Sequence, residues 1–293
     1  MSEAAVASPG RKIRQFDVRV ADIIVETPDT VTLVFDGAGP FEYKAGQFCT
    51  IDPHQFHVSA GTTKFLEDLK KHKEPPRAYS MASTPDEPLA ITIKEELYES
   101  GSTKYPPLLS PVLVHHVAKD SRMLISGFTG PYCLPDNVRE KTDHLVHITA
   151  GSGSVPNWSM LKWAVRHLPT LRHTFIYSNK TWDDVIFRRQ LDEMAAAHPD
   201  KLKVVHALSR EPDAGIRGPN VCPGRVCEAL LREHILDPTA VEVFTCGPGI
   251  GKFERLAAKE KGEEPKPRFL ETALDALEAI GVPDEKVHRE SYG

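Results

Sequence analysis

Short alternating segments dominate the first half of the chain. Apolar and polar residues alternate at residues 16–20 and 31–35, and similar short apolar segments follow at 47–51, 89–93 and 123–125. Alternation with a period of two residues is typical of strands that bury one face. Several such strands, separated by turns rich in proline, glycine and aspartate, predict an antiparallel barrel or sandwich.

The period of the pattern changes in the second half. Short apolar runs occur at residues 145–149, 174–177, 202–207 and 241–245. Helical patterns lie between or after them, at residues 157–167, 183–197, 225–234 and 269–280. Strands that alternate with helices indicate βαβ units around a parallel sheet, whose ligands bind at the carboxyl ends of the strands.

The two patterns together predict a fold of the class β plus α/β. We expect a β-barrel domain over residues 1–138 and a doubly wound parallel α/β nucleotide-binding domain over residues 139–293. The boundary is placed in the polar segment 136–141, where the alternating pattern has ended and the first βαβ unit has not begun.

The composition agrees with two globular domains. The chain has 293 residues, of which 40% are hydrophobic and 26% charged, which is enough for two cores. The net charge of −5 argues against a nucleic-acid binder. No apolar run approaches the roughly 20 residues that span a bilayer. Residues 1–6 lack a basic segment followed by an apolar one, so we expect no secretory signal and a cytoplasmic location.

The cysteines and histidines do not form a recognisable cluster. The five cysteines are odd in number and scattered, so a disulfide framework is not expected. Cys222 and Cys227 have the first spacing of a plant-type iron–sulfur site, but no cysteine follows two residues later. The histidine pairs at 54/57 and 115/116 lack carboxylates or cysteines at metal-ligand spacing, so no metal site is predicted.

A glycine turn is the main candidate site in the second half. Gly151, Gly153 and Pro156 lie between the apolar run 145–149 and the helical pattern 157–167. Glycine allows the backbone to approach a pyrophosphate closely, and a helix N-terminus supplies free N–H groups. Proline suits the first turn of a helix. The order strand, turn, helix favours a dinucleotide site over a turn of purely structural role.

Cys246-Gly247-Pro248 ends the last long apolar run of the α/β pattern. In a doubly wound sheet this segment lies opposite the glycine turn, where it would form a wall of a nicotinamide pocket. Hydride transfer needs positioning rather than a thiolate, so Cys246 is not expected to act as a nucleophile. A buried cysteine before a structural turn is the alternative.

Arg77, Tyr79 and Ser80 are the candidate residues of the first half. They lie on a predicted strand and offer a charge for a phosphate, a ring for a flavin face and a hydroxyl for its heteroatoms. Taken alone, they favour an ordinary strand that has one exposed arginine.

The order of the motifs resembles the ferredoxin–NADP reductase superfamily over roughly residues 14–293. In that pattern the first motif, R-x-Y-S-x-x-S, is followed by a second motif, G-P-x-G-x-F. The motifs G-x-G-x-x-P and C-G-P come next, and an aromatic residue lies near the C-terminus. Residues 127–132 look like the second motif, with Phe128 in place of proline, and Glu290-Ser291-Tyr292-Gly293 gives the last. Residues 177–187 are most similar to the reductase components of bacterial oxygenases.

The resemblance implies a six-stranded antiparallel flavin barrel with bound FAD, and NADPH or NADH as the electron donor. It implies that Arg77 binds the FAD pyrophosphate, Tyr79 stacks on the isoalloxazine, Ser80 bonds near its N5, and Tyr292 covers its other face. The catalytic set it implies is Ser80, Cys246, Glu290 and Tyr292. The cofactor-binding set is Arg77, Tyr79, Ser80, Ser83, Ile93, Ser110, Gly127, Gly130, Gly151, Gly153, Pro156, Ser178, Asn179, Lys180, Arg210, Cys246, Gly247, Pro248 and Tyr292.

The chain departs from the family pattern in three places. Pro107-Leu108-Leu109 precedes Ser110 where the family has a glycine, which leaves FAD and FMN both open because proline donates no N–H. Two insertions, at residues 54–76 and 251–268, are expected either to contact a partner or shield the flavin, or to be solvated decorations. The first is predicted to contain a helix with Phe65, Leu66 and Leu69 on one side.

The preferred nucleotide and the function follow from the remaining residues. Ser178, Asn179 and Lys180 follow the second α/β strand and Arg210 follows the third, and the basic residues there favour NADPH over NADH because they suit its 2′-phosphate. We predict an NAD(P)H oxidoreductase that passes electrons to an iron–sulfur protein or an oxygenase component. The alternatives are a reductase of free flavin or a ferric chelate, and a non-catalytic nucleotide-binding subunit for redox sensing or assembly.

Overall fold

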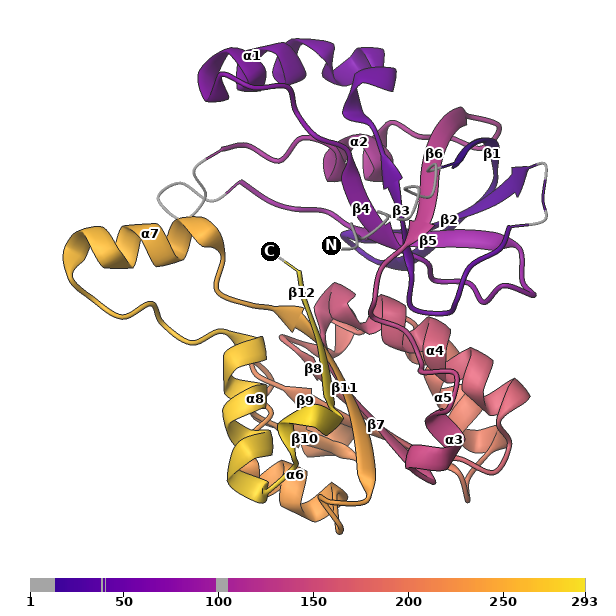
Figure 1. Cartoon of the computed structure of the whole chain (residues 1–293), viewed down its shortest axis with the longest axis vertical. Helices are drawn as coiled ribbons and strands as arrows, with labels where there is room; N and C mark the ends of the chain where they lie inside the picture. Colours follow the sequence, from indigo (N-terminus) through magenta and orange to yellow (C-terminus); the bar gives the residue numbers. More distant parts are fainter. Residues whose placement is uncertain (1–13, 38, 40, 99–104, 293) are drawn as a thin grey trace, which may run out of the picture.

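The computed structural model describes residues 14–37, 39, 41–98 and 105–292, and within these ranges the strands form two sheets of six (Figure 1). The first sheet is antiparallel, with the order β4-β3-β6-β1-β2-β5. Met81 pairs with Ile91, so the end of β4 meets β5 and the sheet curls into a barrel. Its strands are β1 (Arg14–Thr27), β2 (Thr30–Gly37), β3 (Phe48–Ile51), β4 (Arg77–Ser80), β5 (Leu89–Lys94) and β6 (Arg122–Thr129).

The second sheet is parallel throughout, with the order β10-β9-β8-β7-β11-β12. The four inner strands of this order are almost wholly buried on both faces, which explains why their sequences read as short continuous apolar runs. The edge strands β10 and β12 are partly exposed. The strands are β7 (His144–Ala150), β8 (Arg172–Asn179), β9 (Leu202–Leu208), β10 (Val221–Pro223), β11 (Val241–Pro248) and β12 (Val287–Tyr292).

Helices cover both faces of the parallel sheet (Figure 1). α4 (Ser154–His167) and α5 (Arg188–Ala197) pack on one face, and α6 (Glu228–His234) and α8 (Phe269–Ile280) pack on the other. The remaining α-helices are α1 (Ala60–Lys70), α2 (Ser110–His115), α3 (Val138–Lys141) and α7 (Lys252–Lys261). The short 3-10 helices are η1 (Pro53–Gln55), η2 (His57–Ser59), η3 (Gly151–Gly153), η4 (Trp182–Asp184), η5 (Ala214–Arg217) and η6 (Asp284–Lys286).

The predicted fold class is confirmed, and two local predictions are wrong. The helix predicted at 183–197 begins only at Arg188, because Phe187 has a left-handed backbone (φ 57°) that separates α5 from η4. In α1 the apolar residues do not share one face: Leu66 is buried, whereas Phe65 and Leu69 are exposed. A spacing of four residues places Phe65 and Leu69 together, on the side of the helix that faces solvent.

The connection between the domains runs from the end of β6 at Thr129 to the start of β7 at His144. It contains α3 and the polar segment in which the boundary was placed, and the division after residue 138 stays a prediction. Residues 1–6 lie outside the described part of the chain. Among the described helices, none has the length and apolar character required to cross a membrane.

Candidate active site

The end of β4 meets the carboxyl ends of β11 and β12 at the interface of the two domains. The Tyr292 hydroxyl donates a hydrogen bond to Ser80 Oγ, across 212 positions of the sequence. Beside it, Ser159 of α4 donates to the carbonyl of Ser83 at 2.6 Å. The Tyr132 hydroxyl donates to Asn157 Oδ1 at 2.9 Å. These bonds fix the barrel against the parallel sheet where three of the predicted motifs end.

Ser80, Cys246, Glu290 and Tyr292 form what we call the redox-end cluster. Cys246 is opposite Glu290 in the pairing of β11 with β12, and Tyr292 is opposite Pro248. Ser80 and Cys246 are buried, and Glu290 and Tyr292 are half-buried. The four predicted catalytic residues therefore gather at one place, although they come from three strands.

The redox-end cluster favours neutral side chains. Burial raises the pKa of Glu290 to about 7. Burial, and then the charge of Glu290, raise the pKa of the Cys246 thiol well above its usual range. Burial raises the pKa of Tyr292 in the same direction, with smaller contributions from Cys246 and Glu290. A thiol held protonated is a poor nucleophile, in line with the expectation that Cys246 does not act as one, and its predicted place in a nicotinamide pocket stays a prediction.

The glycine turn lies directly against the end of β11. A Cβ atom on Gly153 would be 2.2 Å from the carbonyl oxygen of Cys246, so only glycine fits. Gly151 has a left-handed backbone (φ 52°), and a Cβ there would meet no atom within 4 Å. The Tyr177 hydroxyl is hydrogen-bonded to Gly151 O at 2.9 Å and to Ser154 Oγ at 2.8 Å, and these hydrogen bonds hold the turn against β8. The turn is thus packed on one side and open on the other, where a phosphate has access to the helix N-terminus.

The other residues of these two motifs fill the walls of the same region. Pro156 is buried in the first turn of α4, and Pro248 is half-buried at the end of β11. A Cβ on Gly247 would lie 2.5 Å from the ring of Phe269, so this glycine lets α8 pack against β11. The sequence motif G-x-G-x-x-P and the motif C-G-P therefore serve the packing of the site as well as its predicted ligand.

Arg77 lies three residues before Ser80 on β4 and is partly exposed. Its Nη2 donates to Glu74 Oε2 at 2.5 Å and its Nη1 donates to the carbonyl of Pro75 at 2.6 Å. Tyr79 is half-buried and packs against the barrel core. The guanidinium predicted to bind a phosphate is therefore already oriented by a carboxylate, a contact that the sequence did not reveal.

Three predicted flavin-binding side chains are engaged within the barrel. The Ser83 hydroxyl is 2.8 Å from Tyr43 Oη and accepts from the Ala90 N–H at 2.9 Å. Ser110 Oγ accepts from the Glu96 N–H at 3.0 Å, and Ile93 belongs to the hydrophobic core. In this geometry the direct contribution of these side chains is to the barrel, and their contacts with a cofactor stay predictions.

Gly127 and Gly130 lie where β6 passes β3. A Cβ on Gly130 would be 2.9 Å from the ring of Phe48, and one on Gly127 would be 3.1 Å from Cys49 Cα. Both glycines therefore allow the close approach of these two strands, and their predicted role in flavin binding is untested.

The residues predicted to select the nucleotide lie at the carboxyl ends of β8 and β9. Ser178 and Asn179 are buried, whereas Lys180 and Arg210 are exposed. The Arg210 N–H donates to the carbonyl of Lys180 at 2.8 Å, which brings the two cations to one edge. Both amide atoms of Asn179 are buried without a hydrogen-bond partner among the described residues. This edge is positive, as the binding of a phosphate requires, but the choice between NADPH and NADH stays a prediction.

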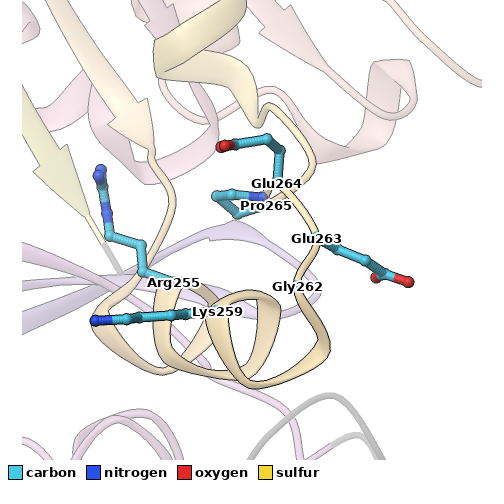
Figure 2. Close-up of a pocket in the computed structure, with 6 residues that line it drawn as sticks. All are labelled: Arg255, Lys259, Gly262, Glu263, Glu264 and Pro265. Carbon is cyan, nitrogen blue, oxygen red and sulfur yellow. The ribbon is translucent and has the colours of Figure 1, made fainter.

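The insertion 251–268 carries α7 and a surface hollow of about 450 Å³ (Figure 2). The hollow is lined by Arg255, Lys259, Gly262, Glu263, Glu264 and Pro265. None of these is a predicted site residue, and the mixture of both charges around an open surface does not define a ligand. The candidate active site is therefore the interface of the two domains, away from this hollow.

Comparisons with known proteins agree with the geometry of the second domain. Residues 148–255 match the family model described as the oxidoreductase NAD-binding domain. The matched stretch begins in β7, includes the glycine turn and Cys246-Gly247-Pro248, and ends in α7. The nucleotide-binding α/β domain predicted from the glycine turn is confirmed.

Relatives match nearly the whole chain. The ferredoxin reductase component of a 3-ketosteroid-9-alpha-monooxygenase from Mycolicibacterium smegmatis is 28% identical over 94% of this chain and 65% of its own length. The reductase subunit of a glycine betaine monooxygenase from Chromohalobacter salexigens is 26% identical over 94% of this chain and 64% of its own. The chain thus spans slightly less than two thirds of the length of these curated relatives.

Solved structures share the fold. The flavohem-like FAD/NAD binding domain of a nitric oxide dioxygenase from Vibrio cholerae has a TM-score of 0.68 and 18% identity, covering 95% of this chain and 98% of that one. Ferredoxin-NADP+ reductase from Plasmodium falciparum has a TM-score of 0.66 and 19% identity, covering 95% and 96%. Together, the matches confirm the resemblance to ferredoxin–NADP reductases in fold and to the reductase components of oxygenases in sequence.

Proposed function

We propose that this chain is a flavin-dependent NAD(P)H oxidoreductase that passes electrons from NADPH or NADH through FAD to a one-electron acceptor. The observation that carries the proposal is the redox-end cluster, in which Tyr292 of the α/β domain bonds Ser80 of the barrel beside Cys246 and Glu290. A site shared by a barrel and a nucleotide-binding sheet suits a reaction in which two cofactors must meet.

The residues present fit both cofactors. Arg77 would hold the phosphates of FAD, with Tyr79 and Tyr292 as aromatic surfaces for its ring system. The open side of the turn at Gly151, where added atoms meet nothing within 4 Å, would take the phosphates of the nicotinamide nucleotide. When bound, the flavin supplies the ability to accept a hydride and return its two electrons singly.

The side chains of the redox-end cluster would position the reactants and control protons. Cys246 and Gly247 form a close-packed wall against Gly153, which excludes water from that side. Tyr292 is held by Ser80 and has to move for a nicotinamide ring to reach the same place. Glu290, with its pKa of about 7, is able to hold or release a proton near neutral pH.

We further propose an iron–sulfur protein or an oxygenase component as the acceptor, and the cytoplasm as the location. The named roles of the relatives support the acceptor, since both are reductase components or subunits of monooxygenases. The five cysteines are free, which suits a reducing compartment and leaves the described residues without a disulfide.

The first test is an absorbance spectrum of the purified protein, before and after anaerobic addition of NADPH and then NADH. We expect flavin bands near about 370 and 450 nm that bleach on reduction, because those bands belong to any oxidised flavin. The nucleotide that bleaches them faster is the preferred donor. A colourless protein that also fails to take up added FAD would refute the enzyme and favour a nucleotide-binding subunit.

A further inference from the structure

The insertion 54–76 places one fully buried carboxylate beside the predicted phosphate-binding arginine. The Glu74 side chain has no exposed surface. Its Oε1 lies 2.7 Å from Lys70 Nζ and its Oε2 lies 2.5 Å from Arg77 Nη2. We call Lys70, Glu74 and Arg77 the phosphate-end cluster. With two cations and one anion it keeps one net positive charge.

The rest of the insertion holds Glu74 in place. The Glu74 N–H donates to Glu67 Oε1 at 3.0 Å, and the same oxygen lies 2.9 Å from His54 Nε2. The ammonium of Lys70 lies 4.5 Å from the ring centroid of Tyr105, which adds a cation–π contact on the outer side. Contacts from both ends of the insertion therefore converge on the segment that carries the carboxylate.

Glu74 differs from the surface charges of α1 because its side chain is fully buried. Lys64 and Asp68 form a pair on the same helix, with side chains 72% and 65% exposed, and such pairs contribute little. Burial alone would raise the pKa of Glu74, but its pairing with Lys70 and Arg77 outweighs burial and lowers the pKa. Glu74 is therefore ionised at neutral pH, and the two cations offset the cost of burying its charge.

The contact leaves Arg77 able to bind a phosphate. A guanidinium has five N–H donors, and Glu74 and Pro75 O each take one of them. The side chain is 33% exposed, so part of it is accessible from the surface. A long side chain that is clamped before a ligand arrives loses less conformational freedom when it binds.

We propose that Glu74 is a positioning residue for the flavin phosphates, and that the insertion 54–76 serves to supply this fixed carboxylate to Arg77. Glu74 acts through Arg77 and makes no contact with the flavin itself. The inference rests on the proposed function, and it gives the insertion a role other than partner contact, shielding of the flavin or solvated decoration.

The test measures the affinity for FAD of full-length protein from which bound flavin has been removed. The variant Glu74→Gln and the control Asp68→Asn are each compared with the wild type. Quenching of flavin fluorescence measures binding without turnover. We expect the dissociation constant for FAD to rise about ten- to a hundredfold in Glu74→Gln, because the charged acceptor that holds Arg77 becomes a neutral amide, and to stay unchanged in Asp68→Asn.

A double-mutant cycle separates positioning from a general structural effect. If Glu74 acts through Arg77, the variant Glu74→Gln/Arg77→Gln binds FAD no more weakly than Arg77→Gln alone. Additive losses, or an unchanged affinity in Glu74→Gln, would overturn the inference. If Glu74→Gln does not fold, Glu74→Asp keeps the charge on a shorter arm, and wild-type affinity in Glu74→Asp would count against positioning.

The outcomes also separate this inference from the proposed function. A wild-type protein that binds no FAD contradicts the proposed function. A wild-type protein that binds FAD, together with a Glu74→Gln variant of equal affinity, contradicts only the role of Glu74.

Discussion

Glu74 and Glu290 are two shielded carboxylates at opposite ends of the candidate site, and their environments differ in one respect. Glu74 lies between Lys70 and Arg77, and its pKa is lowered. Glu290 has one buried oxygen with no partner among the described residues, and burial raises its pKa to about 7. The comparison teaches that burial drives a carboxyl towards its neutral form unless fixed cations reverse the effect.

The phosphate-end cluster and the redox-end cluster are also held together by different interactions. The phosphate-end cluster is held by ion pairs between Glu74 and Lys70 of one inserted segment and Arg77 of β4. The redox-end cluster is held by close backbone packing, with Gly153 against Cys246, and by one hydroxyl pair. The first end is suited to binding an anion, and the second is suited to keeping protons and excluding water.

The largest expected effect comes from the packing of the redox end. In Gly153→Ala the added Cβ would lie 2.2 Å from the Cys246 carbonyl, so β11 and the turn must separate. We expect a loss of about 3 kcal/mol of unfolding free energy, which is typical of severe overpacking, and strongly slowed flavin reduction by NAD(P)H. Urea unfolding and stopped-flow reduction measure the two effects. The control Gly61→Ala, where a Cβ meets no atom within 4 Å, is expected to be neutral or slightly stabilising.

The next effect tests the charge difference directly. Glu74→Leu leaves Lys70 and Arg77 without their shared anion, and we expect a loss of about 2–3 kcal/mol, reduced because Arg77 is 33% exposed. Glu290→Leu removes a carboxyl that has no cation, so at pH 8 it is expected to be neutral or stabilising. Chemical unfolding of the two variants compares them. Equal losses in both would show that the cations at the phosphate end do not matter.

The two carboxylates also predict opposite dependences on pH. The folded-state pKa of Glu290 lies above its usual 4.5, so its contribution to stability falls as the pH rises from about 4.5 to 7. The pKa of Glu74 is lowered, so its contribution is present above about 4.5 and is lost as the pH falls below that value. Glu290→Gln is expected to remove a fall of about 1–2 kcal/mol between pH 5 and 8, after allowance for partial exposure. Unfolding curves at both pH values check this, and an unchanged fall would place its origin elsewhere.

The smallest effect concerns the bond between the domains. Tyr292→Phe and Ser80→Ala each remove the hydrogen bond, and we expect a loss of about 1 kcal/mol in either variant. The double variant should lose little more than one single variant, because both remove the same bond. Thermal unfolding of the three variants measures the coupling. Fully additive losses would mean that the two hydroxyls act separately.

Much of the fold could be predicted because it depends on local pattern. Alternation at residues 16–20 marks a strand with one buried face, and the apolar runs 145–149 and 241–245 mark strands buried on both. Residues 31–35 alternate as well, although both faces of β2 are largely buried there. The break at Phe187 was missed because a left-handed residue without glycine leaves no mark in a hydrophobic pattern. The exposed face of α1 was missed because helical spacing alone does not tell which side of a helix is covered.

The motifs of the candidate site were recognisable in the sequence, but the contacts between their residues were not. Cys246 and Gly153 were recognisable from their order along the chain, whereas the 2.2 Å approach that requires glycine was not. Glu74 had a faint signal, a lysine four residues before it and an arginine three residues after it. Because the insertion is rich in charged residues, this spacing did not distinguish a buried carboxylate from a solvated one.

The sequence by itself determined the two periods, the order of the motifs and the residue types that suit a flavin and a nucleotide. Only the tertiary structure decided which side chains meet, how deeply each is buried and which carboxylate keeps its charge. The reason is physical: secondary structure follows from neighbours along the chain. The pKa of Glu290 and the orientation of Arg77 depend instead on desolvation and on groups that folding brings within a few ångströms.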